Sequence, residues 1–372
     1  MRLNVDPNYF DYAASTPPFC EAINEYRSVA SEFYANPSSM HSSGKRARQK
    51  LLELKKSFCD LLRFHDGRLL LCSTGSEANN TVIEGHLRYF PDANVLVAED
   101  VHDSIWYATK KHQNSTRILK IDHDGCVDLK VLERALDKRI TLLCINHVCG
   151  ETGKIHPVRD IAGICYGSGV KLLIDGTQSI GHIPVDLNEI PCAYYTFSGH
   201  KFGAVKSSGG VLHRDSEFVP LIFGGNQEWN LRAGTEDIAG LASAVKALRL
   251  SLDRLSEEAD RLLGLKRLIV KRLKDFPEVT FNTSANSYPG ILSLCFSGVT
   301  GRAIVGALSL KGFAVSTGSA CHASVEEPSR ILMAMGRTKD LARGSLRISM
   351  GAGTTENAVL ELLDALAELR QT

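Results

Sequence analysis

The thiol of Cys321 lies in a run of small residues, Ser316-Thr-Gly-Ser-Ala-Cys-His-Ala-Ser324, which two glutamates and a proline soon follow. Small residues without a hydrophobic period do not build a core, so this run predicts a mobile loop. Because the thiolate is the nucleophilic form of cysteine, a thiol on such a loop can attack a substrate that is bound elsewhere. The neighbouring sequence does little to favour ionisation, since His322 is adjacent but Glu326 and Glu327 oppose it.

A lysine and an aspartate indicate where that substrate would be bound. Lys201 follows the apolar segment 193–197, and Asp175 ends the apolar run that begins at Leu172. Alone, each residue has an ordinary interpretation, as a solvated lysine and as a turn residue. Together they suit pyridoxal phosphate, because a lysine can bind its aldehyde as a Schiff base and a carboxylate can keep its ring nitrogen protonated.

Two further segments could complete such a site. Gly75 and Ser76 stand at the start of an expected helix, after a strand-like run, and free N–H groups at a helix start bind phosphate. A turn of this composition is more often only a helix cap. His102 follows another strand-like run, where a histidine could stack on a ring and move protons, or could be an ordinary loop residue.

The composition is that of an ordinary globular protein. The 372 residues suffice for two or three domains, and a net charge of +1 favours neither nucleic acid nor an anionic membrane as a partner. No apolar run is long enough for a membrane helix, and the first residues lack the apolar core of a signal peptide, so we expect a cytoplasmic protein. The ten cysteines contain no Cys-x-x-Cys pair, which argues against a metal site and a disulfide scaffold.

Short apolar runs alternate with helical patterns between residues 66 and 215. The expected strands are 68–72, 94–98, 141–145, 171–174, 193–196 and 209–213, and the expected helices are 79–87, 105–112, 129–136 and 158–166. This alternation predicts an α/β domain with a largely parallel sheet, in which ligands bind beyond the carboxyl ends of the strands.

The pattern changes after residue 241. We expect a long amphipathic helix over 241–276 with a break near 257–260, then strands at 290–296, 314–316 and 345–350 and helices at 301–310 and 355–369. These elements predict a smaller α+β domain. The expected division is therefore a large domain of residues 16–245 and a small domain of residues 1–15 and 246–372, which carries the cysteine loop.

In their order along the chain, these segments resemble the cysteine desulfurases of the nitrogen-fixation and housekeeping iron–sulfur type. The resemblance runs from Phe10 to the last helix, with markers at 35–41, 75–80, His102, Asp175, Gln178, 198–201, 224–228, 232–235, 318–321 and Arg347. It implies fold type I of the pyridoxal phosphate-dependent transferases, within the class V aminotransferases. That fold has a large domain with a mostly parallel seven-stranded sheet and a small α+β domain. The form of the cysteine loop matches the first of the two groups of the family.

The resemblance implies the chemistry of the site. Lys201 would bind the cofactor, Asp175 would pair with its ring nitrogen, and Gln178 would lie on its phenolic oxygen side. His102 would stack on the ring and act as acid and base. Cys321 would take the sulfur of L-cysteine as a persulfide, releasing L-alanine, and would pass the sulfur to an acceptor protein.

The resemblance also implies which residues bind the substrate carboxylate and the cofactor phosphate. Arg347, with Asn36, would bind the substrate carboxylate, because the planar guanidinium matches a carboxylate. The cofactor phosphate would be held by Gly75, Ser76, Ser198 and His200, and by Thr235 of the neighbouring subunit in a homodimer.

The chain departs from the family in three places, one of which is Gly351-Ala-Gly353, where relatives usually carry Gly-Arg-Phe. Cys149 and Gly150 stand where relatives usually carry two asparagines, the second of which hydrogen-bonds the phenolic oxygen of the cofactor. Losing one such bond, worth about 1 kcal/mol, would tune rather than abolish activity. The sequence stops at Thr372, where longer relatives continue with a tail that docks the iron–sulfur scaffold. The acceptor would be that scaffold or a protein of DNA phosphorothioation or tRNA thiolation.

Two other functions are compatible with these motifs. One is a selenocysteine lyase or another class V enzyme, although enzymes that need no thiol would not require Cys321. The other is a protein of low activity that binds the cofactor and serves as the scaffold of a sulfur-transfer complex. Retention of both Lys201 and Cys321 weighs against the scaffold.

Overall fold

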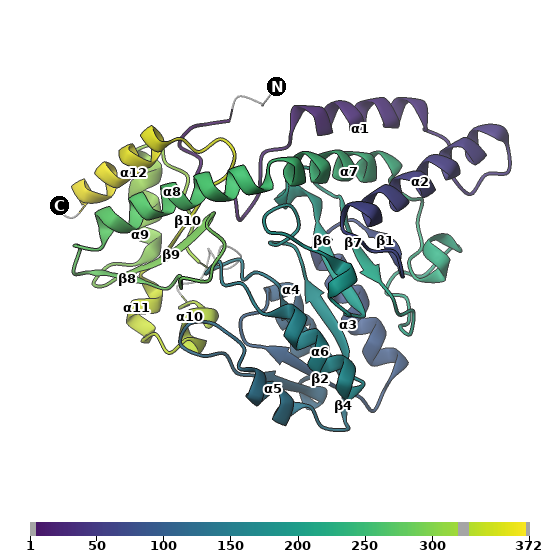
Figure 1. Ribbon diagram of the computed structural model, residues 1–372, viewed down its shortest axis with the longest axis horizontal. Coiled ribbons are helices and arrows are strands. Elements are labelled where there is room, and N and C mark those ends of the chain that lie inside the picture. The colour runs from purple at the N-terminus through teal and green to yellow at the C-terminus, as the bar shows by residue number, and fades with distance from the viewer. Residues whose placement is uncertain (1–4, 319–326, 370–372) are drawn as a thin grey trace.

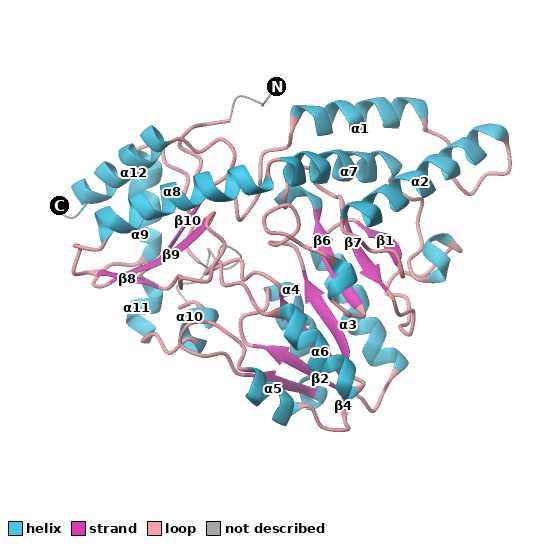
Figure 2. Cartoon of the chain, in the orientation of Figure 1, coloured by secondary structure: helices cyan, strands magenta, loops and turns pink. Residues whose placement is uncertain are grey.

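Two β-sheets organise the chain (Figures 1 and 2). The computed structural model describes residues 5–318 and 327–369, so Cys321 lies outside the described residues. A seven-stranded sheet with helices on both faces forms the larger part, and a three-stranded sheet covered by the later helices forms the smaller part. The expected α/β fold of type I is confirmed.

The large sheet has the strand order β1-β7-β6-β5-β4-β2-β3. Its strands are β1 (Arg68–Cys72), β2 (Asn94–Ala98), β3 (Thr116–Leu119), β4 (Ile140–Asn146), β5 (Lys171–Asp175), β6 (Tyr194–Ser198) and β7 (Gly209–His213). Only β7 runs antiparallel to its neighbours, so the mostly parallel sheet is as expected. The sequence did not indicate β3, because this edge strand is short and buries only its last residue.

Seven helices accompany this sheet in the described residues: α1 (Cys20–Glu32), α2 (Ser42–Leu61), α3 (Gly75–Tyr89), α4 (Asp103–Lys110), α5 (Leu129–Ala135), α6 (Val158–Ser168) and α7 (Ile238–Asp253). Local capping fixes their ends. Thr74 Oγ1 accepts from the Glu77 N–H at the start of α3, so this helix begins before residue 79, where we expected it. Gly169, with a φ of 68°, ends α6 in the left-handed region that favours glycine.

The smaller part holds β8 (Val279–Phe281), β9 (Ile291–Phe296) and β10 (Ser345–Ser349), with α8 (Leu255–Leu273), α9 (Gly301–Leu310), α10 (Arg330–Ala334), α11 (Lys339–Arg343) and α12 (Glu356–Leu369). The expected strand at 314–316 is wrong. Ala314 and Ser316 form isolated bridges to two different partners, Tyr9 and Arg347, so no continuous ladder develops.

The long helix that we expected over 241–276 is interrupted, but not near 257–260. The chain leaves helical geometry at Arg254, with φ −114° and ψ 4°, and α7 and α8 are separate helices. Glu257 and Glu258 instead lie in the first turn of α8, where acidic side chains stabilise the helix start.

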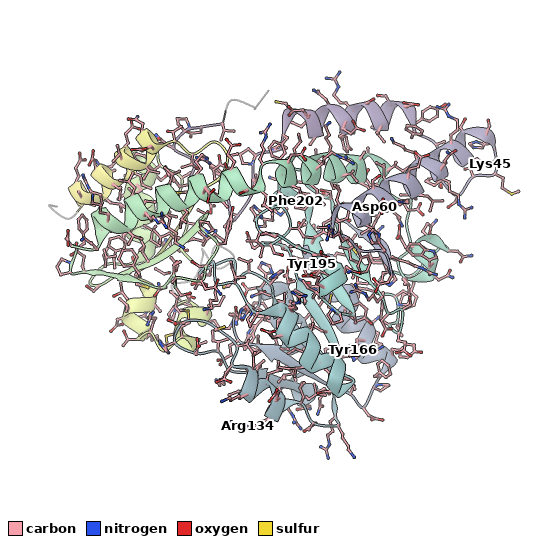
Figure 3. The ribbon with its side chains drawn as sticks, viewed as in Figure 1. Lys45, Asp60, Arg134, Tyr166, Tyr195 and Phe202 are labelled. Carbon is pink, nitrogen blue, oxygen red and sulfur yellow. The ribbon has the colours of Figure 1, made fainter. Side chains whose placement is uncertain are left out.

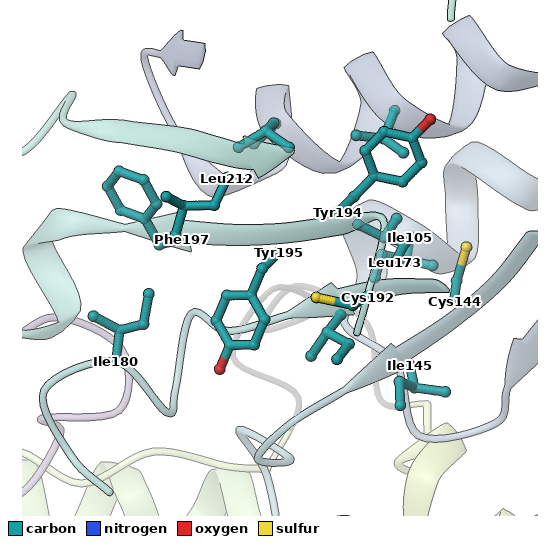
Figure 4. Close-up of a cluster of buried hydrophobic side chains, with 14 of the residues drawn as sticks. Ile105, Cys144, Ile145, Leu173, Ile180, Cys192, Tyr194, Tyr195, Phe197 and Leu212 are labelled. Carbon is teal, nitrogen blue, oxygen red and sulfur yellow. The ribbon is translucent and has the colours of Figure 1, made fainter. Parts of the chain in front are cut away.

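Each sheet has its own hydrophobic core. The larger core includes Tyr194, Tyr195 and Phe197 of β6, which Figure 4 shows among neighbouring aliphatic side chains. The smaller core packs β9 and β10 against α8, α9 and α12. In Figure 3 the labelled Tyr195 and Phe202 lie within the molecule. Among the described residues, no helix combines the length and apolar character needed to cross a membrane.

A buried ion pair fastens the segment that carries Thr235 to α2, and a hydrogen bond joins the same glutamate to the edge strand β1. The Nζ of Lys55 lies 2.7 Å from both carboxylate oxygens of Glu228, and these side chains are 10% and 1% exposed. The Leu71 N–H also donates to Glu228 at 3.2 Å. Burial raises the pKa of Glu228, and the charge of Lys55 opposes that effect.

We expect Lys55→Ala to lower the free energy of unfolding by about 3–5 kcal/mol, because it leaves a buried carboxylate without its cation. The matched control is Lys56→Ala, which removes an exposed pair with Asp60 and is expected to cost less than about 1 kcal/mol. Urea unfolding of the two variants measures the difference. Equal losses would contradict the structural role of the buried pair.

Candidate active site

Two adjoining cavities lie at the carboxyl ends of the central strands. Their volumes are about 290 and 460 Å³. The walls of both include His102, Gly150, Gln178 and Lys201. The smaller cavity reaches the start of α3, and the larger one extends toward Arg347 and α10. The two cavities therefore lie beyond the carboxyl ends of the strands, where the sequence predicts the site.

Lys201 and Asp175 both line the smaller cavity. The Lys201 side chain follows β6, and its Nζ donates to the carbonyl oxygens of Ala13 at 2.6 Å and Ala14 at 2.8 Å. Asp175, the last residue of β5, is buried with both carboxylate oxygens hydrogen-bonded. Oδ2 accepts from Asn79 Nδ2 at 2.9 Å, and Oδ1 accepts from the Thr177 N–H at 2.9 Å. The carboxylate is thus fixed in place in a cavity that an amine also lines.

The far end of the smaller cavity is suited to an anion. It is formed by Gly75 and Ser76 at the start of α3, together with Ser198 and His200. The first N–H groups of a helix have no partner within it and favour negative charge. A Cβ at Gly75 would lie 3.0 Å from Thr177 Oγ1 and 3.3 Å from Ser198 Cβ, so the three segments form a close cradle.

Two histidines in the cavity wall are neutral near pH 7. Burial and the nearby lysines lower the pKa of His200 to about 4, and its Nδ1 lies 3.2 Å from Ser15 Oγ. The protein around His102 also lowers its pKa by desolvation, although Asp175 opposes the shift and the ring is open to the cavity. Because His102 Nδ1 accepts from the Ser104 N–H at 3.1 Å, the proton of the neutral ring lies on Nε2.

Arg347 of β10 borders the larger cavity and joins three segments. Its Nη1 donates to the Gly150 carbonyl at 3.0 Å, and its Nη2 pairs with Asp11 at 2.9 Å. Its buried Nε has no hydrogen-bond partner in the described part of the chain. Gln178 lies near Gly150, and its Nε2 donates to the Ala13 carbonyl at 2.8 Å.

Asn36 and Thr235 lie elsewhere. The Asn36 amide donates to Thr235 Oγ1 at 3.5 Å, both residues are exposed, and neither lines these cavities. A single chain therefore does not bring Asn36 to Arg347. No group of three or more potential ligands for a metal ion occurs within residues 5–318 and 327–369.

The sequence did not indicate the residues that hold the Asp175 carboxylate in place. Asn79 bonds Asp175, and its own Oδ1 accepts from Thr196 Oγ1 at 2.6 Å. Thr177 and Asn146 also line the smaller cavity. The only signal for Asn79 was its position one helical turn after Gly75, which places it on the same helix face.

The aminotransferase class-V model matches residues 8–362. The chain belongs to this family. It is 31% identical to "Cysteine desulfurase IscS" of Dictyoglomus turgidum, over 98% of this chain and 95% of that protein. It is also 31% identical to "IscS-like cysteine desulfurase" of Mycobacterium tuberculosis, over 98% and 97%. A solved structure, "NIFS-LIKE PROTEIN", covers 100% of both chains at a TM-score of 0.90 and 27% identity. The resemblance seen in the sequence is confirmed.

Members of this family depend on pyridoxal 5′-phosphate. The residues present fit that cofactor, because a buried, doubly hydrogen-bonded carboxylate and an amine share one cavity with a helix start. Lys201 would bind the aldehyde, Asp175 the ring nitrogen, and Gly75, Ser76, Ser198 and His200 the phosphate.

We expect Asn79→Ala to weaken cofactor binding about tenfold or more, because a hydrogen bond to a charged group is worth about 1.5–3 kcal/mol. Titration of the apoprotein with pyridoxal phosphate, followed by absorbance, gives the dissociation constant. The control is Asn188→Ala, at an exposed position in the short 3-10 helix Leu187–Glu189. An unchanged dissociation constant for Asn79→Ala would show that Asp175 needs no support from α3.

Proposed function

We propose that this protein is a pyridoxal phosphate-dependent cysteine desulfurase that converts L-cysteine to L-alanine and takes the sulfur on Cys321. The arrangement of Lys201, Asp175 and the α3 start in one cavity carries the proposal. Relatives named as cysteine desulfurases, which match almost the whole chain, support the substrate.

The cofactor, when bound, supplies an electron sink that makes the α-proton of the substrate acidic. Arg347 would hold the substrate carboxylate beside its existing contacts with Gly150 and Asp11. The Lys201 amine and the neutral His102 ring, with its proton on Nε2, are the groups that would move protons. Both line the two adjoining cavities.

The sulfur-transfer step would use Cys321. Its thiolate would attack the sulfur of bound cysteine, so that an S–S bond forms and the Cβ–S bond breaks. The electron pair of the broken bond remains with the carbon skeleton, which takes up a proton and leaves as alanine. The product on the protein is a persulfide, and a second thiol of an acceptor can remove its outer sulfur by the same type of exchange.

A homodimer is part of the proposal. Asn36 and Thr235 contact each other on the surface, outside the cavities of their own chain, which is the arrangement expected if they serve the site of a neighbouring subunit.

An iron–sulfur scaffold or a thiolation or phosphorothioation protein would accept the sulfur. We also propose the cytoplasm as the location, and residues 16–245 as the large domain, with 1–15 and 246–372 as the small one.

Two variants separate the roles of Lys201 and Cys321. We expect Cys321→Ala to keep the near-visible absorbance of the bound cofactor and to lose sulfide and alanine formation from L-cysteine, because only the sulfur acceptor is removed. Lys201→Ala should lose the absorbance as well, since it removes the covalent attachment.

The controls are Cys20→Ala and Lys206→Ala, which should leave absorbance and turnover unchanged. Full activity of Cys321→Ala would refute the persulfide step. Alanine formation from selenocysteine by Cys321→Ala, at the rate of the unmodified protein, would favour a selenocysteine lyase. Turnover near zero in the unmodified protein, with its cofactor bound, would favour the scaffold function.

The missing side chain at Gly150 can be tested by restoring it. A Cβ there would lie 3.4 Å from the Gln178 side chain, an ordinary contact, so Gly150→Asn should fold. One added hydrogen bond to the cofactor, worth about 1 kcal/mol, should tighten cofactor binding about fivefold and shift its absorbance maximum. Gly167→Asn in α6, where nothing lies within 4 Å, is the control. An unchanged spectrum and affinity would contradict this role for position 150.

A further inference from the structure

Arg330 is the first residue of α10 and stands on the chain that follows Cys321. Its backbone is well anchored. Leu332 and Met335 are buried in the core of the large sheet, although α10 comes between elements of the smaller part. The hydroxyl of the buried Ser329 accepts from the Leu332 N–H at 3.1 Å and caps the helix. The Arg330 side chain therefore starts from a fixed point beside the large sheet.

The Arg330 guanidinium contacts the turn that carries His102. Its Nη1 donates to the Glu99 carbonyl, and its Nη2 donates to the Val101 carbonyl at 2.7 Å. Nη2 also lies 3.6 Å from the Asp103 carboxylate. Val101 and Asp103 are the residues directly before and after His102. Because a guanidinium is planar and its donors have a fixed geometry, it holds both sides of His102 in one arrangement.

The same guanidinium lies against an aromatic ring of α4. Its central carbon is 4.1 Å from the centroid of the Trp106 ring, which is within the range of a cation–π contact. Trp106 is one helical turn from His102, whose carbonyl accepts from the Trp106 N–H at 3.1 Å. Arg330 is therefore tied to the first turn of α4 as well as to the turn before it.

The contacts of the His102 ring fix only its direction. Its Nδ1 accepts from the Ser104 N–H at 3.1 Å and lies 2.8 Å from Ser104 Oγ. These groups belong to the same turn, so they orient the ring relative to its own backbone. The place of that backbone depends on longer contacts. The Asn146 amide holds the Asp100 carbonyl at 2.6 Å from β4, and Arg330 holds the turn from α10.

We propose that Arg330 is a positioning residue for the desulfurase reaction, because it determines where the His102 ring stands in the cavity. The inference rests on the proposed function, in which His102 moves a proton. Arg330, Trp106 and His102 all line the larger cavity. Displacing a catalytic group by about 1 Å can slow a reaction by a factor of about 100. Arg330 therefore contributes to the rate through the place of His102.

The charge of Arg330 also acts on His102. Desolvation by the surrounding protein has the largest effect and lowers the pKa of His102. The carboxylates of Asp175 and Asp103 raise this pKa, whereas the cations of Lys201 and Arg330 lower it further. Removing the Arg330 cation should thus raise the pKa of His102, so that the neutral ring is lost at a higher pH as the pH falls.

The test compares variants of the holoenzyme. Arg330→Met removes the charge and the donors, and Arg330→Lys keeps the charge without the planar fork. The matched control is Arg214→Met. Arg214 also donates to two backbone carbonyls, those of Cys192 at 2.9 Å and Leu187 at 2.7 Å. Its guanidinium carbon lies 4.7 Å from the centroid of the Phe64 ring, but Arg214 is not among the described residues that line the two cavities.

Alanine formation from L-cysteine, with excess dithiothreitol as the acceptor thiol, is the first readout. We expect Arg330→Met and Arg330→Lys to lower kcat by about tenfold or more, because both lose the contacts that bracket His102. The KM for cysteine should change by less than about threefold, since Arg347, which would hold the substrate carboxylate, is untouched. Arg214→Met should leave both constants unchanged. Circular dichroism and cofactor content check that each variant is folded.

The second readout does not depend on turnover. In holoenzyme labelled with ¹³C in its histidine rings, the signal that is absent from His102→Gln belongs to His102, and its titration gives the pKa. Arg330→Met should raise this pKa, whereas Arg330→Lys should leave it unchanged, because lysine keeps the cation. At a pH where the ring is neutral, the signal should shift in both Arg330 variants, because the ring is displaced in both. Arg214→Met should show neither change.

An unchanged kcat or an unchanged His102 signal in folded Arg330→Met would overturn the proposal. A rise of KM alone would also overturn it, because that result would assign Arg330 to substrate binding. If Arg330→Met does not fold, Arg330→Lys decides by its kcat and its His102 signal. If the unmodified protein forms no alanine, the desulfurase function fails, and the His102 signal still shows whether Arg330 positions the ring.

Discussion

The Asp175 carboxylate is buried at the end of β5 and accepts hydrogen bonds from two different elements. The donors are the Asn79 amide of α3 and the Thr177 N–H of the following turn. A buried carboxylate without such donors would be costly, and it would not stay where a ring nitrogen needs it. Asn79 can serve only because Thr196 on the next strand fixes its amide. The charge that we propose for the ring nitrogen of the cofactor is therefore stabilised by three neighbouring segments.

The pairing of the strands determines where those segments end. Asn146, Asp175 and Thr196 are partners across β4, β5 and β6, so their side chains reach the same edge of the sheet. The antiparallel β7 begins at Gly209, beside the end of β6. A Cβ at this glycine would lie 2.6 Å from the backbone of Thr74, so only glycine lets the start of α3 approach so closely. The anion end of the cavity depends on that approach.

The sequence predicted the parts of the site that follow a strand. Lys201, Asp175, Gly75 and His102 all come at or shortly after the ends of apolar runs, and the parallel sheet brings such positions together. Asn79 was not predicted, because an asparagine within a helix has no periodic or strand-end signal. The helices α1 and α2 were missed for a similar reason, since they precede the strand–helix alternation from which the fold was inferred.

Other features depend on long-range pairing that local sequence cannot encode. The carbonyl groups of Ala13 and Ala14, which hold the Lys201 amine, carry no side-chain signal at all. The pair of Asn36 and Thr235 joins positions far apart in the chain, and the role that we propose for it requires a second copy of the chain. The buried pair of Asp100 and His156 likewise joins two separate loops, although each residue alone is unremarkable in the sequence.

The contacts around Arg347 imply that binding a carboxylate there also affects how the two sheets are held together. Arg347 belongs to the small sheet, but its guanidinium donates to the Gly150 carbonyl of the large part and pairs with Asp11 of the N-terminal segment. That same segment supplies the Ala13 carbonyl that accepts from Gln178 and Lys201. A guanidinium has a fixed set of donors, so a substrate carboxylate must either use the remaining ones or displace Asp11. The second outcome would release the N-terminal segment from Arg347, and in that case substrate binding and the packing of the two cores would be coupled at this residue.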